Sequence, residues 1–495
     1  MNKIINYLLV VLALFLILSL FWGRSTYDAF TIEQLIFQLK VNQKGLDASI
    51  IYSFIYKVII PLIILTLLYT IVIEKKLEKI WFEVRIFNKI FEFNLFSFSL
   101  ITNYMVISGI YILTLSLGFC CYNIGVPEYL KNNITQSKFF ENVYFKPENI
   151  TFNKKKNLIH IYVESFENTY LSKDLGGVED VNLIPSMSNL LKEGISFSNN
   201  EKHGGMLETY GATWTVGALV AQTSGLPLNL QIDANSYSAE NAKFLEGAVS
   251  LGEILETNGY SNNIIFGSDA TYAGRKNYFE QHGNYHITDW ISLKEEGKLD
   301  KDYKEWWGFE DSKLFNFAKE EILEISQNNK PFNYTILTAN THFSDGYTEK
   351  TCTLDNNRKY ASSISCSDKM IYDFVNWIKK QNFYKDTVIV ITGDHLSMDK
   401  KHFEKVDKNY TRTVFNNFLN TNIKNVNNKN RLVSSFDVFP TTLSLLGATW
   451  EGDRLGLGTN LFSDSKTIFE EYGYDYVNNE LKKKSIFYNK EILGY

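Results

Sequence analysis

The sequence predicts an α/β protein in two parts, a region of three transmembrane helices followed by a doubly wound domain with a mostly parallel sheet. Three long apolar runs lie in roughly the first quarter of the chain. From about residue 155, short apolar strands alternate with helical segments, which is typical of parallel sheets. The predicted boundaries are residues 1–125 for the membrane region, 126–154 for a linker, 155–470 for the sheet domain and 471–495 for a C-terminal extension.

The composition is that of an ordinary folded chain. Its 495 residues are 45% hydrophobic and 21% charged, with only 7 Pro and 29 Gly, which excludes a disordered, collagenous or low-complexity protein. The formal net charge is -5, from 50 Lys and Arg against 55 Asp and Glu. Because this balance gives no electrostatic attraction to phosphate backbones, we expect no nucleic-acid partner.

Each apolar run has the length of a membrane-spanning helix. The runs cover Ile4–Trp22, about 51–73 and about 100–122, close to the ~20 residues that a bilayer requires. Lys57 lies near enough to an end of its span to reach the interface, and Pro61 is tolerated in membrane helices. The first run is longer than the ~7–15 residues of a signal-peptide core, so we expect an uncleaved anchor.

Positive charge predicts the orientation of these spans. The loop between the second and third spans holds Lys75, Lys76, Lys79, Arg85 and Lys89. The first loop holds only Arg24, Lys40 and Lys44. By the positive-inside rule the lysine-rich loop is cytoplasmic, so everything after about residue 123 lies outside.

The outer domain contains a single pair of cysteines. Cys352 and Cys366 are close enough in sequence to close a short loop. A disulfide suits an oxidising compartment, whereas two free thiols are the alternative, and the sequence leaves both open.

Polar residues follow the clearest predicted strands, which cover residues 158–163, 261–266, 332–337 and 387–392. Glu164 follows the first of these strands, and Asp394 and His395 follow the last. A lone carboxylate at a strand end is usually a helix cap, but ligands of open α/β sheets gather at the carboxyl ends of strands. Two carboxylates and one imidazole at one edge therefore predict a site for Mn²⁺, Mg²⁺ or Zn²⁺.

The segment Gly211–Leu228 contains two threonines just before an apolar helical stretch. A hydroxyl of Thr213 or Thr215 would lie at a helix N-terminus, where backbone N–H groups favour an anion. Both threonines are equally consistent with simple N-caps. A threonine hydroxyl becomes a useful nucleophile only when a base or a metal lowers its pKa, and the predicted metal site offers this.

Four short motifs in order make the chain resemble the membrane phosphoglycerol transferases, the family of phosphoglycerol transferase I and lipoteichoic acid synthase in the alkaline phosphatase and sulfatase superfamily. The motifs are Glu164–Glu167, Gly211–Thr215, Thr341–Tyr347 and Gly393–Met398. The similarity extends to Thr31–Asp47, Asp437–Leu446 and Leu455–Phe462. The resemblance implies a sulfatase-like catalytic domain.

The resemblance also implies the residues of the catalytic centre. It implies that one divalent cation, with Mn²⁺ favoured over Mg²⁺ and Zn²⁺, is bound by Glu164, Thr213, Asp394 and His395. Thr213 is the implied nucleophile.

Two further residues match substrate contacts of the family. His342 matches a histidine that contacts the transferred head group, and Arg275 matches a phosphate-contacting arginine of lipoteichoic acid synthases. Those relatives have a tryptophan and a histidine where this chain has Ala273 and Phe266. Because of this difference, the chain resembles the glucan-modifying members of the family more than the lipoteichoic acid synthases.

Trp214 and His402 are weaker candidates for substrate binding. Trp214 stands where other branches have a small polar residue, so it either shapes the pocket or packs in the core. Among the other histidines, His402 is best placed to carry a proton or contact phosphate, and a plain surface histidine is the alternative.

The implied activity is transfer of a phosphoglycerol group from phosphatidylglycerol to a hydroxyl of a periplasmic or cell-surface glycan. The protein would then be a multi-pass protein of a bacterial inner membrane, with the bilayer, a lipid donor and a glycan acceptor as its partners. Alternatives are a phosphoethanolamine transferase acting on lipid A or a surface glycan, a sulfatase-like hydrolase, and an inactive lipid- or glycan-binding protein. A sulfatase activity is disfavoured because no cysteine begins the C-x-P-x-R pattern of a formylglycine precursor.

Overall fold

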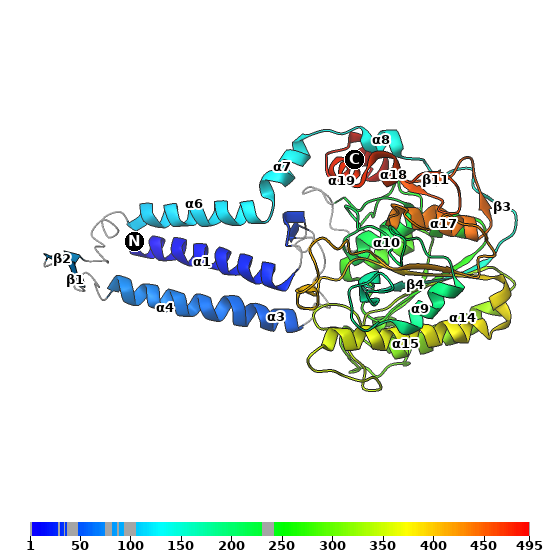
Figure 1. Cartoon of the computed structure of the whole chain (residues 1–495), viewed down its shortest axis with the longest axis horizontal. Helices are drawn as coiled ribbons and strands as arrows, with labels where there is room; N and C mark the ends of the chain where they lie inside the picture. Colours follow the sequence, from blue (N-terminus) through cyan, green and yellow to red (C-terminus); the bar gives the residue numbers. More distant parts are fainter. Residues whose placement is uncertain are drawn as a thin grey trace. The chain divides into compact units, whose positions relative to one another are not determined.

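The computed structural model describes residues 2–27, 30–33, 35–36, 48–74, 82–86, 89–93, 105–229 and 242–494. These residues form two compact units, whose helices and strands are labelled in Figure 1. The first unit comprises Met1–Ile32 and Asp47–Leu130, and the second comprises Glu33–Leu46 and Lys131–Tyr495.

The first unit contains three helical segments long and apolar enough to cross a membrane, Ile4–Thr26, Ile50–Ile71 and Val106–Asn123, which confirms the three predicted spans. Its elements are α1 (Asn2–Thr26), α3 (Ala48–Phe54), a π-helical turn (Ile55–Ile59), α4 (Ile60–Glu74), the antiparallel pair β1 (Phe82–Ile86) and β2 (Lys89–Phe93), and α6 (Met105–Asn123). Residues 100–104 of the third predicted span lie outside the described residues, as do Lys40, Lys44, Lys75, Lys76 and Lys79. The orientation therefore stays a prediction.

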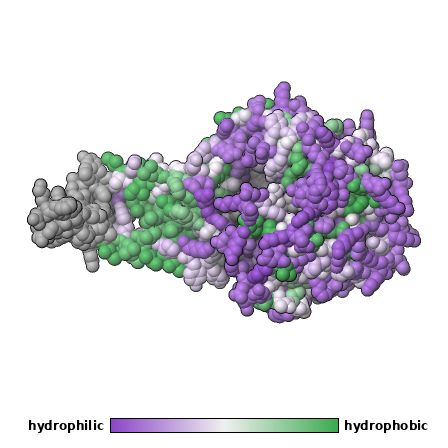
Figure 2. Space-filling model, viewed as in Figure 1, coloured by the Kyte–Doolittle hydropathy of each residue, from purple (hydrophilic) through white to green (hydrophobic). Residues whose placement is uncertain are grey.

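Hydrogen bonds between side chains join the spanning helices. Asn6 Nδ2 donates to the hydroxyl of Tyr69 at 2.6 Å, and Trp22 Nε1 donates to Ser53 Oγ at 3.2 Å. Pro61 lies just after the π-helical turn, where the lost backbone N–H disturbs the α-helical pattern least. Hydrophobic residues dominate the surface of these helices in Figure 2, as lipid contact requires.

The second unit is built on a six-stranded sheet of order β6-β5-β7-β4-β8-β9. In that order the strands are His286–Thr288, Ser261–Phe266, Phe332–Leu337, Asn157–Val163, Thr387–Gly393 and Asn416–Leu419. All neighbours are parallel except β8 and β9. The four strands predicted from sequence are thus four adjacent, parallel strands of one sheet, and the doubly wound fold is confirmed.

Helices cover both faces of this sheet. Ile159, Ile161 and Val163 of β4 face one core, and Leu158 and Tyr162 face the other side, as the two-residue period of a strand requires. The first core is covered by α9 (Pro185–Glu193), α14 (Asp311–Ser326) and α15 (Lys359–Lys379). The opposite side is covered by α10 (Thr215–Ser224), α11 (Leu251–Thr257), α12 (Arg275–Gln281) and α17 (Val438–Leu445). Figure 1 shows α10 and α17 across β4 from α14 and α15.

Smaller elements complete the unit. The remaining α-helices are α7 (Val126–Ile134), α8 (Phe139–Val143), α13 (Trp290–Glu295), α16 (Lys400–Phe403), α18 (Ile468–Tyr472) and α19 (Tyr474–Leu481). The remaining strands are β3 (Thr151–Phe152), β10 (Ala448–Thr449), β11 (Arg454–Leu455) and β12 (Gly458–Thr459). Val477, Leu481 and Tyr488 are buried in the same core as α10, so the C-terminal segment packs into the sheet domain.

The two cysteines of this unit form a disulfide. Cys352 and Cys366 are joined with their Cα atoms 5.7 Å apart, which ties the loop before α15 to that helix. The structure thereby decides between the two alternatives that the sequence left open.

Candidate active site

The carboxyl ends of β4 and β8 bring three predicted metal ligands together. The strands are parallel neighbours with Val163 opposite Gly393, so the residues that follow them emerge side by side. Glu164 Oε1 lies 3.5 Å from His395 Nε2, which lies 3.4 Å from Asp394 Oδ2. The three side chains are buried, with 3%, 4% and 0% of their residue surfaces exposed for Glu164, His395 and Asp394. We call these three residues the ligand cluster.

A threonine hydroxyl completes the cluster, and it belongs to Thr215. Its Oγ1 lies 3.3 Å from Glu164 Oε2 and 3.3 Å from His395 Nε2. Thr213 lies in a bend two residues before α10, and in the described part of the chain no hydrogen bond joins it to the cluster. The structure therefore places Thr215, and not the predicted Thr213, against the ligands, because α10 begins at Thr215.

The position of α10 is set by a side chain two turns further along the helix. Gln222 Nε2 donates to the carbonyl oxygen of Gly393 at 2.9 Å, and Gln222 Oε1 accepts from Thr392 Oγ1 at 2.7 Å. Both hydrogen bonds attach the buried face of α10 to the end of β8. They hold the first turn of the helix beside the ligand cluster.

Ser165 orients both carboxylates of the cluster. Its backbone N–H donates to Asp394 Oδ1 at 2.7 Å, and its hydroxyl donates to Glu164 Oε1 at 2.7 Å. The backbone of Ser165 has φ of 51°, a left-handed conformation that is uncommon outside glycine. Such a conformation persists where the surrounding structure enforces it. Here it directs the N–H and the hydroxyl of Ser165 to two different carboxylates.

The imidazole of His395 presents one defined nitrogen to the cluster. Its Nδ1 lies 2.8 Å from the carbonyl oxygen of Leu396. A carbonyl oxygen can only accept, so Nδ1 donates to Leu396, and Nε2 is the ring nitrogen that faces the carboxylates. This is the arrangement of a metal-binding histidine.

The residues present fit a divalent cation. Asp394 Oδ2 is buried and has no hydrogen-bond partner among the described residues. A buried carboxylate oxygen without a partner is costly, and a cation bound between the two carboxylates and the imidazole would remove that cost. Oxygen ligands with one nitrogen suit Mn²⁺, Mg²⁺ or Zn²⁺.

Burial and mutual charge shift the pKa values of the cluster. Burial raises the pKa of Asp394 to about 7, and the negative charge of Glu164 acts in the same direction. Burial alone would raise the pKa of Glu164, but the positive charges of His342 and His395 outweigh it and lower that pKa. Burial disfavours the charged form of His395, yet the two carboxylates raise its pKa. Cation binding would therefore displace protons from the cluster.

His342 and Arg275 act electrostatically on Glu164, as the charges that shift these pKa values show. His342 lies in the loop after β7, half-buried, with its ring centroid 4.5 Å from that of Trp307. Arg275 is the first residue of α12, and its Nη2 donates to the carbonyl oxygen of Asp269 at 2.6 Å. Both predicted substrate contacts thus lie within electrostatic range of the cluster.

The other two predicted contacts have structural partners. Trp214 packs against the core at the start of α10. Its ring lies so close to Gly217 that a Cβ atom at that position would be 3.1 Å from Trp214 Cε2. His402 lies on α16, with Nε2 3.3 Å from Glu179 Oε1 and its ring beside Tyr360. Among the described interactions of His402, none reaches the ligand cluster.

Sequence inspection missed Trp306 and Trp307. Trp307 lies against His342, and Trp306 stacks on Tyr347 of the same loop, with 5.9 Å between ring centroids. The sequence signal that could have identified them is the consecutive pair of tryptophans. Two adjacent large aromatic residues are rarely both buried in a core, and here both residues are half-buried.

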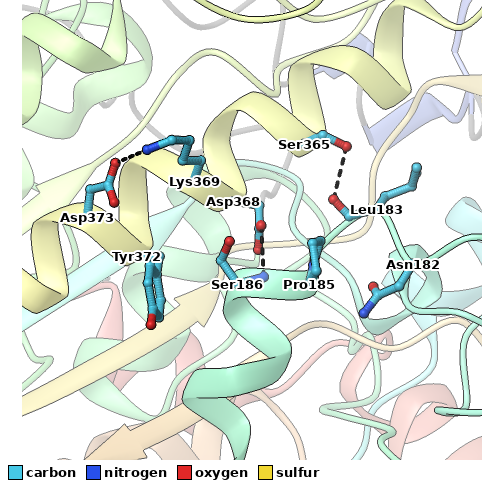
Figure 3. A pocket seen from close by; sticks show the side chains of 9 residues that line it. All are labelled: Asn182, Leu183, Pro185, Ser186, Ser365, Asp368, Lys369, Tyr372 and Asp373. Atoms are coloured by element: carbon cyan, nitrogen blue, oxygen red, sulfur yellow. Dashed lines mark hydrogen bonds and ion pairs between the residues drawn. The ribbon is translucent and has the colours of Figure 1, made fainter.

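A separate hollow of about 440 Å³ lies between α9 and α15 (Figure 3). Asp368 accepts the N–H groups of Ser186 at 3.0 Å and Met187 at 2.7 Å, and so caps the start of α9. Ser365 Oγ donates to the carbonyl oxygen of Leu183 at 3.0 Å. None of the ligand-cluster residues lines this hollow. Its buried carboxylate, Asp368, already accepts hydrogen bonds from the start of α9.

Comparison with known sequences agrees with the geometry. The family model described as Sulfatase matches residues 156–448. Phosphoglycerol transferase I of Salmonella typhimurium is 33% identical over 280 residues, which cover 54% of this chain and 35% of that protein. The protein of the same name from Salmonella typhi is 32% identical over 280 residues, with the same shares covered. The chain thus spans about a third of the length of these curated relatives.

Solved structures show the same fold. A lipoteichoic acid synthase of Listeria monocytogenes superposes with a TM-score of 0.51 at 18% identity, covering 66% of this chain and 80% of that one. The integral membrane protein lipooligosaccharide phosphoethanolamine transferase A of Neisseria meningitidis gives 0.52 at 13% identity, covering 90% and 84%. With its three apolar helices this chain is an integral membrane protein, and its sheet domain and family match show that it belongs to the sulfatase family.

Proposed function

We propose that this chain is a membrane-bound transferase that moves a phosphoglycerol group from phosphatidylglycerol to a hydroxyl of a periplasmic or cell-surface glycan. The observation that carries the proposal is the contact of Thr215 Oγ1 with both Glu164 and His395, at 3.3 Å each. A hydroxyl held between a carboxylate, an imidazole and a helix N-terminus is arranged as a nucleophile towards an anionic phosphoryl group. The similarity to phosphoglycerol transferase I supports the choice of the transferred group.

The cation, for which Mn²⁺ is our first choice, would be held by Glu164, Asp394, His395 and Thr215. Thr215 takes the place of the predicted Thr213 in this set. When bound, such a cation lowers the pKa of the nucleophile and neutralises charge on phosphoryl oxygens.

In the first half-reaction, Thr215 Oγ1 attacks the phosphorus of the lipid phosphodiester. A bond forms between Oγ1 and phosphorus, the bond from phosphorus to the diacylglycerol oxygen breaks, and diacylglycerol leaves with the proton. His342 and Arg275 are the proposed contacts of the phosphoglycerol moiety, since both lie within electrostatic range of Glu164. Thr215 retains a phosphoglycerol ester.

In the second half-reaction, a glycan hydroxyl attacks the same phosphorus. The bond from phosphorus to Thr215 Oγ1 breaks, Oγ1 regains a proton, and the acceptor loses one. Two successive displacements let a lipid and a glycan use one site in turn. We further propose that the catalytic unit faces the outside of a bacterial inner membrane, where both substrates are found.

The direct test is mass spectrometry of the purified full chain after incubation with Mn²⁺ and vesicles of phosphatidylglycerol. We expect an added phosphoglycerol on the peptide with Thr215, with fragmentation assigning it to that residue. Parallel incubation with phosphatidylethanolamine is the control for the donor. An adduct with phosphatidylethanolamine alone would make the protein a phosphoethanolamine transferase, and no adduct with either lipid would contradict a transferase of this type.

A further inference from the structure

We propose that Trp306 and Trp307 form an aromatic platform that binds a neutral sugar ring of the acceptor glycan beside the ligand cluster. This inference rests on the proposed function and deepens it, because it assigns residues that would bind the acceptor.

The two tryptophans form the tip of a tight turn. Glu305 N–H donates to the carbonyl oxygen of Gly308 at 2.9 Å, and Gly308 N–H donates to the carbonyl oxygen of Glu305 at 3.0 Å. Trp306 has φ of 53°, a conformation that glycine adopts easily and large side chains rarely adopt. The fold thus holds an indole ring where backbone preference alone would favour glycine.

This turn packs on the loop that carries His342. The Trp306 ring stacks on that of Tyr347 with an interplanar angle of 28°, and the Trp307 ring lies 4.5 Å from that of His342. The residue before His342, Thr341, donates its hydroxyl proton to the backbone carbonyl oxygen of Glu164 at 2.5 Å. The platform therefore packs on a loop that also contacts the backbone of the ligand cluster.

The exposed surface of the platform is apolar ring carbon. Both residues are half-buried, and both Nε1 atoms are buried without a hydrogen-bond partner in the described part of the chain. The part of each ring open to a ligand is consequently carbon. Pyranose rings with equatorial hydroxyls present a face of C–H bonds, whose positive hydrogens complement the negative face of an indole.

The charge beside the platform favours a neutral sugar over an anionic lipid head group. Glu305 Oε2 accepts the hydroxyl proton of Tyr347 at 2.9 Å. A carboxylate at this place accepts sugar hydroxyls and repels phosphate. A sugar stacked on Trp306 would thus be held next to the phosphoglycerol ester of Thr215, while Arg275 and His342 serve the donor.

Binding of a free sugar tests the platform directly. We would titrate the full chain, in a detergent without a sugar head group, with α- and β-linked glucose tetrasaccharides and follow tryptophan fluorescence and calorimetric heat. We expect Trp306→Gly to weaken binding at least about tenfold. Trp306→Phe, which keeps an aromatic face, should lose less. Trp450→Phe is the matched control, since Trp450 packs against a different core.

Trp306→Gly also separates binding from folding. Glycine relieves the unfavourable φ at this position, which offsets part of the lost stacking on Tyr347, so the variant should still fold and melt in a single cooperative transition. Absence of saccharide binding in the wild type, or unchanged binding in Trp306→Gly, would overturn the platform. Loss of binding to phosphatidylglycerol vesicles with sugar binding unchanged would identify the tip as a lipid contact instead.

The Thr215 adduct distinguishes this inference from the function on which it rests. An adduct from phosphatidylglycerol without saccharide binding would uphold the transferase and overturn the platform. Saccharide binding that depends on Trp306 without any adduct would uphold the platform as a glycan site and overturn the proposed reaction.

Discussion

Thr215 Oγ1 lies 3.3 Å from His395 Nε2, although the two residues are 180 positions apart in the chain. The contact exists because Gln222 attaches α10 to the end of β8, the strand that His395 follows. The hydroxyl therefore lies between the positive end of a helix and two carboxylates. This is the relationship from which the proposed chemistry follows.

Replacement of Thr215 by alanine should lower diacylglycerol release from phosphatidylglycerol by at least about 10³-fold, as loss of a nucleophile does in other enzymes that use covalent catalysis. Thr213→Ala is the matched control, and it should stay within about tenfold of the wild type, since no hydrogen bond joins its hydroxyl to the cluster in the described part of the chain. Release of radiolabelled diacylglycerol measures both. A severe loss of diacylglycerol release in Thr213→Ala, with release retained in Thr215→Ala, would identify Thr213 as the nucleophile.

Replacement of Ser165 by alanine should weaken cation binding roughly 10–100-fold, because an outer hydrogen bond that orients a ligand typically has this effect. The hydroxyl of Ser165 donates to Glu164 Oε1 at 2.7 Å, and the variant leaves this oxygen without that donor. Calorimetric titration of metal-stripped protein with Mn²⁺ gives the affinity. Ser365→Ala serves as the control, since its hydroxyl bonds the distant Leu183 carbonyl. Equal affinities for the two variants would contradict the orienting role.

Replacement of Arg412 by methionine should destabilise the sheet domain by about 3–5 kcal/mol, because it leaves a buried carboxylate without its positively charged partner. Arg412 Nε donates to Glu167 Oε2 at 3.0 Å and Nη2 donates to Glu167 Oε1 at 2.5 Å, while Glu167 is fully buried. Thermal unfolding in detergent would show the loss. Adding Glu167→Gln should recover part of it, and a double variant less stable than Arg412→Met would argue against the buried charge as the cause.

Acid should destabilise the wild type more than a His160→Gln variant. Burial lowers the pKa of His160 from 6.5 to about 3, so the folded protein keeps the ring neutral while the unfolded chain protonates it. The stability that this residue contributes is thus present above pH 6.5 and is lost as the pH falls towards 3.

The expected difference grows by about 1.4 kcal/mol per pH unit, or about 2 kcal/mol between pH 6.5 and pH 5. Unfolding midpoints of both proteins at pH 7, 6 and 5 would measure it. Parallel changes in the two proteins would mean that His160 takes up its proton equally in both states. Only the difference between the two proteins is informative, because Asp311 and Asp437 have pKa values raised to about 7 by burial and respond to pH with the opposite sign.

Local sequence was sufficient for the elements and for most of the cluster. Strands β5 and β7 begin and end at the predicted residues, and nearly all of their residues are buried, as is typical of strands covered on both faces of a parallel sheet. The grouping of Glu164, Asp394 and His395 was predictable because Glu164 directly follows β4, and Asp394 and His395 are the next two residues after β8. Residues whose partners lie in other loops were not predictable in this way. His402 is one example, since its partner Glu179 belongs to a distant segment.

The sequence by itself determined three apolar helices of membrane-spanning length, a parallel sheet and the grouping of three candidate metal ligands, because apolar length, strand period and position after a strand are properties of short segments. Only the tertiary structure decided which threonine reaches that cluster, because the start of α10 is placed by Gln222 against β8. It also decided that Trp306 and Trp307 face the loop of His342. Such side-chain contacts depend on packing between segments far apart in the chain, and no local pattern encodes them.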